Sequence, residues 1–202
     1  MIGGQEAKFT QKNSIVMDFA NYLGAFGFLS IGQVTMWEMF LVVFVKTKHV
    51  QHVKNQQQCS VAAGVAGFVG NKGGMQISFK LYDYLFNVIN VHLVHGEKRF
   101  DKRNEMMSEL IKKMRLQRDE IDPDVIGDFN FIVGDMNYRM IGTYEQLVPQ
   151  IDRLVEMRKD LDQLHKSMTE LQKYPEYHEY DINFKPTYKR NKFEPGYFNK
   201  KN

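Results

Sequence analysis

The sequence is poor in cysteine: Cys59 is the only one in 202 residues, so an intrachain disulfide is excluded and a reducing, cytoplasmic location is expected. Long apolar runs are also missing. The most apolar stretch, residues 23–45, is interrupted by Gln33 and Glu38, which favours buried strands over a membrane-spanning helix. The first residues, MIGGQEAKF, lack the basic start and apolar block of a secretory signal.

What the chain does contain is typical of a folded domain. The hydrophobic fraction is 43% and the aromatic fraction 13%, which is enough for a sizeable core. The formal net charge of +3 permits an anionic partner without requiring one. We find no repeat, low-complexity tract or linker, so the sequence predicts a single unit.

The most informative stretch is FIVGDMNYRM, residues 131–140. Its apolar start predicts a short buried strand over residues 129–133, and Gly134 lets the backbone turn where the strand ends. Asp135 and Asn137 follow one residue apart, so in an extended backbone both side chains leave on the same face.

A carboxylate and a carboxamide aimed at one point suit the chemistry of oxygen. Asp135 can order or deprotonate a water, and Asn137 can bind the oxygen that the water attacks. Arg139 adds a fixed cation that can pair with a phosphate. Glycine, aspartate and asparagine are also common in any strand-to-loop turn, so this motif alone leaves both interpretations open.

A glycine-rich stretch, GNKGG at residues 70–74, precedes an alternating strand at 75–79. Its glycines allow close backbone approach to an anion, and Lys72 adds a point charge at the tip. It is not a Walker loop, because no Ser or Thr follows the lysine and a strand comes next. An ordinary hairpin turn fits the spacing equally well.

Two further strand ends carry polar residues. The segment IGGQE, residues 2–6, reads as a strand end that delivers Glu6, a suitable ligand for a hard divalent cation. The alternating segment LFNVINVHLV, residues 85–94, carries His92, which can donate a hydrogen bond to a phosphoryl oxygen. An isolated Glu is more often a solvated surface residue, and a lone His more often a packed one.

The remaining pattern predicts the scaffold. Residues 39–45 form an apolar run typical of a strand buried on both faces, and residues 46–58 form a polar excursion. A helix is expected at 101–120, with Asp101 near its N-cap, and Arg99 and Arg103 within reach of a ligand. Two more helices are expected in 144–173, divided near Pro149.

The last stretch of interest is YDINFKPTYKR, residues 180–190, which reads as an extended segment. It interleaves tyrosine with Lys185, Lys189 and Arg190, a pattern that can recognise phosphates or a nucleic acid. An ordinary basic loop has the same composition.

Five motifs therefore stand in a fixed order: GGQE (3–6), GNKGG (70–74), NVHLVHG (90–96), GDMNYR (134–139) and PTYKR (186–190). Together they resemble the catalytic domain of the inositol polyphosphate 5-phosphatases, within the endonuclease/exonuclease/phosphatase superfamily. The similarity covers essentially the whole chain. It implies a DNase I-like, four-layer α/β sandwich, in which two mixed sheets pack face to face with helices outside.

The resemblance also implies an activity. It is the Mg²⁺-dependent hydrolysis of the 5-phosphate of phosphatidylinositol phosphates, such as the 4,5-bisphosphate, or of soluble inositol polyphosphates. The protein is then expected to be a monomer that touches membrane surfaces peripherally and does not bind nucleic acid. By position, the implied roles are metal binding for Glu6, catalysis for His92, Asp135 and Asn137, and substrate binding for Lys72, Arg139, Tyr188 and Lys189.

The sequence departs from the family at both ends. It lacks an earlier strand with a metal-binding Asn, and it lacks the later Cys-Asp-Arg and Ser-Asp-His segments that supply an Asp and a His. We therefore expect residues 1–202 to be a partial, truncated catalytic domain. A catalytically impaired phosphoinositide-binding remnant is one alternative, and a nuclease of the same superfamily is another.

Overall fold

The computed structural model describes residues 1–8, 11–63, 72–117, 126–185, 187, 190–191, 193 and 195–197. These residues form two compact units, Met1–Asn137 and Tyr138–Asn202. Each unit is defined by contacts among its own residues, so the two are described separately. In the described part of the chain, no helix combines the length and the apolar character needed to cross a membrane.

The first sheet of the N-terminal unit is antiparallel, with the order β1-β3-β2. Its strands are β1 (Ile2–Gly4), β2 (Phe28–Met36) and β3 (Met39–Lys46). The central strand β3 is buried on both faces, as its apolar run predicted. Leu41 and Val43 pack toward the main core, whereas Phe40 and Val42 pack against Val16 of helix α1 (Lys12–Gly24).

The second sheet is mixed and has the order β4-β5-β6-β7. Its strands are β4 (Val53–Ala62), β5 (Gly73–Leu81), β6 (Tyr84–His92) and β7 (Phe129–Asp135). Strands β6 and β7 are parallel, and the other neighbouring pairs are antiparallel. Helix α2 (Phe100–Leu116) lies between β6 and β7 in the chain, as a parallel connection requires.

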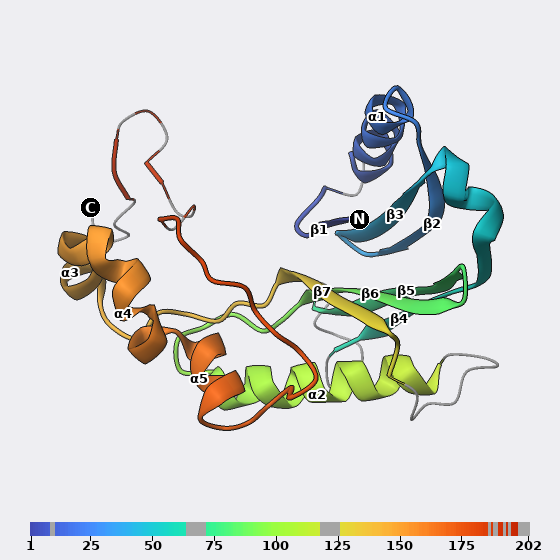
Figure 1. The fold of residues 1–202 in the computed structure, drawn as a ribbon. Helices are drawn as coiled ribbons and strands as arrows, with labels where there is room; N and C mark the ends of the chain where they lie inside the picture. Colours follow the sequence, from blue (N-terminus) through green and yellow to red (C-terminus); the bar gives the residue numbers. More distant parts are fainter. Residues whose placement is uncertain are drawn as a thin grey trace. The chain divides into compact units, whose positions relative to one another are not determined.

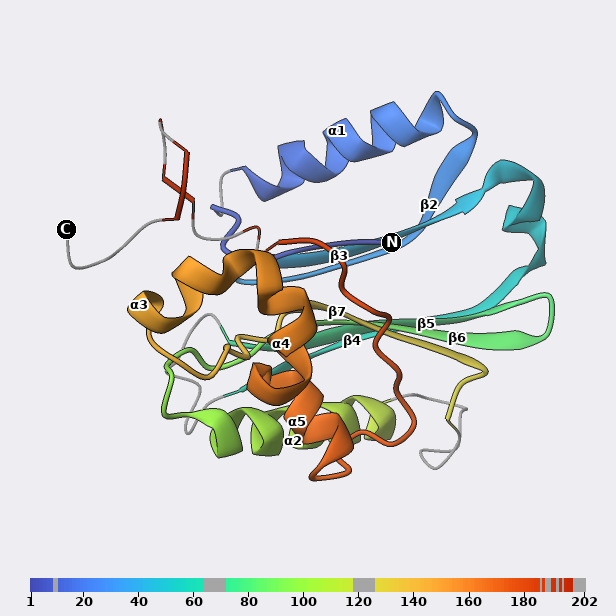
Figure 2. The same ribbon diagram turned by 60° about the vertical axis from the view of Figure 1, so that its left-hand side comes forward.

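The two sheets pack face to face through a core that includes Met39, Met75, Ile77 and Val88. Helix α1 covers the outer face of the first sheet and α2 that of the second (Figures 1 and 2). The four layers are therefore α1, the β1-β3-β2 sheet, the β4-β5-β6-β7 sheet and α2. The four-layer α/β sandwich predicted from the sequence is confirmed.

The boundaries differ from the expectation in several places. The polar excursion at 46–58 is a 3₁₀ helix, η1 (Thr47–His52), that leads directly into β4. Helix α2 begins one residue earlier than predicted, and its N-cap is Arg99, with Asp101 in the first turn. Its predicted end, residues 118–120, lies outside the described residues.

The C-terminal unit is built from short helices rather than from two long ones. They are α3 (Tyr144–Leu147), η3 (Val148–Arg153), α4 (Leu154–Leu161) and α5 (Gln163–Thr169). A kink falls at Gln150, next to the predicted break at Pro149. Asp162 adds a second break, because its extended backbone ends α4 and its carboxylate caps α5 through the N–H groups of Leu164 and His165.

Candidate active site

His92 and Asp135 come together because β6 and β7 are parallel and in register. The two residues are paired at the carboxyl ends of their strands, and the Leu93 N–H donates to the Asp135 carbonyl at 2.9 Å. His92 Nε2 lies 3.6 Å from Asp135 Oδ2. The His side chain is 1% exposed and the Asp side chain 48%, so a buried imidazole meets a carboxylate that water can reach.

Lys72 completes this cluster from the neighbouring strand. It directly precedes β5, whose first residue, Gly73, pairs with His92. Lys72 Nζ contacts His92 Nε2, and its side chain is buried instead of standing exposed at the tip of a loop. Because an ammonium group only donates, Nε2 accepts this hydrogen bond and we assign the ring proton to Nδ1.

A tight turn joins Asp135 to Asn137. Strand β7 ends at Asp135, and Asn137 has a φ of +55°, so the two side chains do not share a strand face as the sequence predicted. Instead the Asn137 N–H donates to Asp135 Oδ1 at 2.9 Å. The buried Asn137 amide Nδ2 donates to the Leu93 carbonyl at 3.0 Å, which anchors the turn beside His92.

Asn90 holds the strand end that carries Glu6. It is fully buried in β6, and its Nδ2 donates to the Phe40 carbonyl at 2.8 Å and to the Gly4 carbonyl at 3.5 Å. Its Oδ1 accepts from Gln5 Nε2 at 2.6 Å. One side chain of the second sheet therefore fixes the end of β1 in the first sheet, just before Glu6.

Glu6 follows β1 in a left-handed turn, with a φ of +55°, and is exposed. Strands β1 and β7 pack against each other, so the turn lies on the side of the sandwich that holds β7. Among the described residues, no three His, Cys, Asp or Glu side chains converge into a ready-made metal cluster. The metal role of Glu6 stays a prediction.

The other residues that the sequence assigned to substrate binding do not join this cluster in the described structure. Arg139 is exposed and belongs to the C-terminal unit, where its N–H donates to Gln163 Oε1 at 3.1 Å. Tyr188 and Lys189 lie outside the described residues. Arg103, which we expected within reach of a ligand, is fully buried and donates to the carbonyls of Val94 and Gly96 at 3.4 and 2.6 Å.

Sequence reasoning missed Asn90 and Gln5. A signal was present, because Asn87 and Asn90 interrupt the apolar alternation of β6. Asn87 bonds within its own sheet, donating from Nδ2 to Asn130 Oδ1 at 2.8 Å. The sequence could not show that Asn90 instead reaches the opposite sheet.

The arrangement brings three complementary groups to one end of the second sheet. The Lys72 ammonium, held in place by the acceptor nitrogen of His92, is a cation suited to an anion. Asp135 lies beside them as a solvent-accessible carboxylate. Phosphoryl oxygens and an attacking water are the chemistry that such a set can serve.

Comparison with known proteins agrees with this geometry. The family model described as Endonuclease/Exonuclease/phosphatase family 2 matches residues 6–202. The chain belongs to this family. A similar curated protein, the type IV inositol polyphosphate 5-phosphatase 7 of Arabidopsis thaliana, is 33% identical over 75% of this chain and 27% of its own length. The mouse inositol polyphosphate 5-phosphatase K is 30% identical over 89% of this chain and 39% of its own length.

Solved structures show the same architecture. The inositol polyphosphate 5-phosphatase domain of SPsynaptojanin, in complex with inositol (1,4)-bisphosphate and calcium ion, matches 97% of this chain and 60% of its own, at a TM-score of 0.86 and 25% identity. The fold is thereby confirmed as DNase I-like. A Cimex nitrophorin in its ferrous NO complex is 22% identical, with a TM-score of 0.75, and is similar in fold alone. The chain spans well under two thirds of the length of the two 5-phosphatase relatives named above.

Proposed function

We propose that this family member hydrolyses the 5-phosphate of inositol phosphates, and that its substrate is a membrane phosphoinositide such as phosphatidylinositol 4,5-bisphosphate. The observation that carries the proposal is the cluster of Lys72, His92 and Asp135 at adjacent strand ends. The motif similarity and the 5-phosphatase relatives support the choice of phosphate ester.

In this proposal, Asp135 accepts the proton of the attacking water. Its Oδ2 is directed toward His92, and its Oδ1 is held by the Asn137 N–H, so the carboxylate is oriented. Lys72 binds the phosphoryl oxygens, where its charge stabilises the negative charge that develops during transfer, and His92 holds the Lys72 ammonium by accepting its hydrogen bond. Asn137 keeps the turn in place through Leu93. Tyr188 and Lys189 are assigned to the neighbouring 4-phosphate by motif position alone.

A Mg²⁺ ion fits the donor chemistry of the site. Mg²⁺ is typically held by one or two carboxylates together with waters and substrate phosphate, and it does not need a cage of three acidic side chains. Glu6 would supply such a carboxylate, and Asp135 keeps its role as the base. When bound, the ion adds positive charge beside the phosphate.

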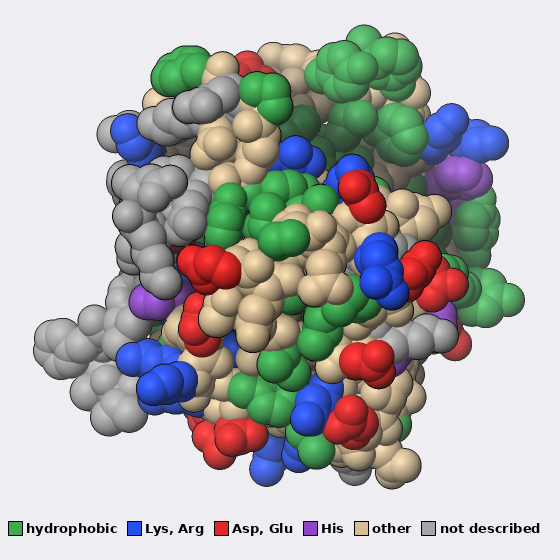
Figure 3. Space-filling view, turned by 90° about the vertical axis from the view of Figure 1, so that its left-hand side faces the viewer, with side chains coloured by type: hydrophobic (Ala, Val, Ile, Leu, Met, Phe, Trp, Pro, Cys, Tyr) green, Lys and Arg blue, Asp and Glu red, His purple; other side chains and the backbone are tan. Residues whose placement is uncertain are grey.

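Contact with a membrane surface is supported by apolar side chains on α1 and the turn after it. Met17, Tyr22 and Phe26 are 64%, 65% and 60% exposed. Hydrophobic side chains lie along the upper edge of the view in Figure 3, where α1 is found. These residues offer a surface that can rest on the membrane while the head group of the lipid is hydrolysed.

The test measures phosphate released from a 4,5-bisphosphorylated inositol head group, with and without Mg²⁺. Release that stops in Asp135→Asn supports the proposal. Binding without release identifies a phosphoinositide-binding remnant instead. Nicking of a supercoiled plasmid under the same conditions, lost in the same variant, identifies a nuclease.

A further inference from the structure

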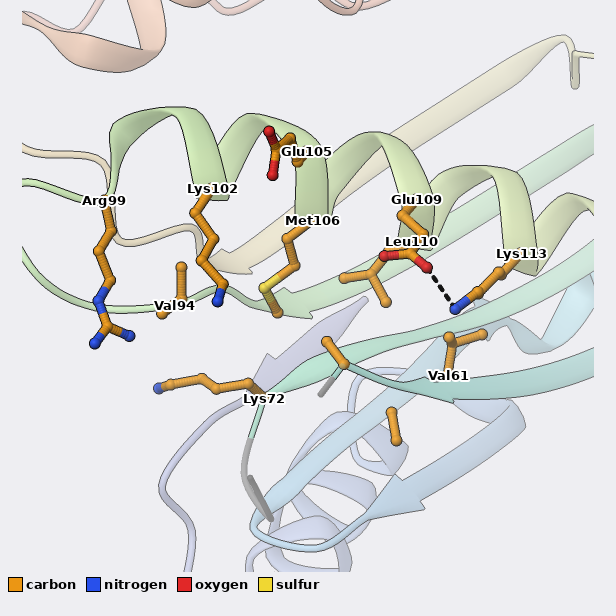
Figure 4. Close-up of a pocket in the computed structure, with 12 residues that line it drawn as sticks. Val61, Lys72, Val94, Arg99, Lys102, Glu105, Met106, Glu109, Leu110 and Lys113 are labelled. Carbon is orange, nitrogen blue, oxygen red and sulfur yellow. Dashed lines mark ion pairs between the residues drawn. The ribbon is translucent and has the colours of Figure 1, made fainter. Parts of the chain in front are cut away.

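A pocket of about 390 Å³ lies between helix α2 and the end of strand β4. Figure 4 shows side chains of α2 pointing down toward β4 and toward the start of β5. The pocket shares Lys72 with the candidate active site but extends from it along α2 as far as Lys113. Among its other lining residues only Arg99 was expected near a ligand, and the proposed function uses none of them.

One end of this pocket is cationic. Arg99, the N-cap of α2, and Lys102, in its first turn, extend toward the side chain of Lys72 (Figure 4). In the part of the chain that the structure describes, neither Arg99 nor Lys102 forms an ion pair. Glu105 also lines the pocket, but its carboxylate is directed away from Lys72 in Figure 4. Three cations facing one space favour an anionic group there.

The rest of the pocket is largely apolar. Met106, Leu110 and Val61 lie along its length toward Lys113, and Val94 lies beside the cationic end (Figure 4). At the far end Lys113 is neutralised by Glu109, with Nζ and Oε1 2.6 Å apart. A ligand that fills the pocket therefore meets positive charge at one end and hydrocarbon beyond it.

We propose that this pocket binds an amphiphile with a phosphate-like anionic head and a short alkyl arm. The head would lie between Lys72, Arg99 and Lys102, and the arm against Met106 and Leu110. A purely polar anion leaves the apolar length unfilled, whereas each buried methylene strengthens binding about fourfold. This site goes beyond the proposed phosphatase activity, although it shares Lys72 with the candidate active site.

The experiment uses hexylphosphonate, whose C–P bond a phosphatase does not cleave, added to protein carrying ¹³C-labelled methionine methyl groups. The Met106 signal, assigned with Met106→Leu, should shift saturably. The fully buried Met39 and Met75 serve as internal references. Methylphosphonate, which has the head alone, should bind at least tenfold more weakly, and hexanol should not compete with hexylphosphonate at equal concentration.

A matched pair of variants tests the cationic end. Lys102→Glu should weaken hexylphosphonate at least fivefold. Lys112→Glu makes the same charge change at an exposed position of α2 that does not line the pocket, and should leave binding unchanged. The proposal is overturned if Met106 does not shift, if hexylphosphonate and methylphosphonate bind equally, or if the two variants weaken binding to the same extent. Loss of phosphate release alone overturns the proposed function and not this site.

Discussion

Asn90 in one sheet and Phe40 in the other are joined by a hydrogen bond of 2.8 Å, from the Asn90 amide to the Phe40 carbonyl. The same side chain also accepts from Gln5, one residue before Glu6. The position of the predicted metal ligand therefore depends on a residue to which we assign neither metal nor substrate binding. We regard Asn90 as a positioning residue for the end of β1.

The first prediction is that Asn90→Leu weakens Mg²⁺ binding at least tenfold and also lowers stability. A buried polar group left without its partner costs roughly 1–3 kcal/mol. Asn87→Leu is the matched control, because Asn87 is buried in the same strand but bonds to Asn130 within its own sheet. Urea unfolding should show a loss of stability in both variants, and titration calorimetry a loss of Mg²⁺ affinity only for Asn90→Leu. Equal Mg²⁺ affinities in the two would assign Asn90 a structural role alone.

The second prediction concerns the carboxylate. Asp135→Asn should reduce kcat for phosphate release by at least a hundredfold, because the amide cannot take the proton of the water while its shape is retained. KM should change little, since substrate binding is assigned to other residues. Steady-state kinetics with Mg²⁺ gives both constants. A variant that keeps its kcat and loses affinity would make Asp135 a binding residue instead.

Much of the scaffold was predictable from local patterns, and the site only in part. The apolar run of β3, the alternation of β6 and the helical pattern of α2 are set by residues close in the chain, and these elements were found where expected. Burial of Lys72 and of Arg103 was not predicted, since each depends on partners in other elements. The prediction that Asp135 and Asn137 share one strand face was also wrong. It assumed strand alternation, whereas Asn137 lies in a turn with a positive φ.

The third prediction addresses the proposed metal ligand. Glu6→Gln should weaken Mg²⁺ binding at least fivefold, because a neutral amide is a poorer ligand for a hard cation than a carboxylate. Glu6 is exposed, so the unfolding free energy should stay within about 0.5 kcal/mol of the wild type. Calorimetry of Mg²⁺ into both proteins is the measurement, with Glu97→Gln at another exposed site as the control. Unchanged affinity would remove Glu6 from the metal site.

The fourth prediction concerns the C-terminal unit. Burial raises the pKa of Glu179, and the Arg158 guanidinium it contacts opposes that shift without cancelling it. The folded state then holds this proton more tightly than the unfolded state does, so stability falls as pH rises from about 4 through the raised pKa. Glu179→Gln lacks this titration. The melting temperature of the wild type, minus that of the variant, should therefore decrease between about pH 4 and pH 7; a difference that increases would reverse the assigned direction.

The last prediction uses two glycines. Gly134 lies in β7 at a φ of +120°, and a Cβ built there would lie 2.1 Å from the Val91 carbonyl oxygen and 2.7 Å from Asn90 Oδ1. Gly134→Ala must therefore move the backbone that aligns Asp135 with His92, at a cost we expect to exceed about 3 kcal/mol.

Gly24, in helix α1, is the matched control, because its Cβ would meet nothing within 4 Å and its φ is not positive. Gly24→Ala should stabilise the protein by about 0.5–1 kcal/mol, since alanine loses less backbone entropy on folding. Urea unfolding of both variants gives the two free energies. Binding of an inositol bisphosphate should weaken only in Gly134→Ala, because Gly134 lies against Asn90 and directly precedes Asp135. If Gly134→Ala had the same urea midpoint as the wild type, the close contact of β7 with β6 at Gly134 would not determine how His92 and Asp135 are paired.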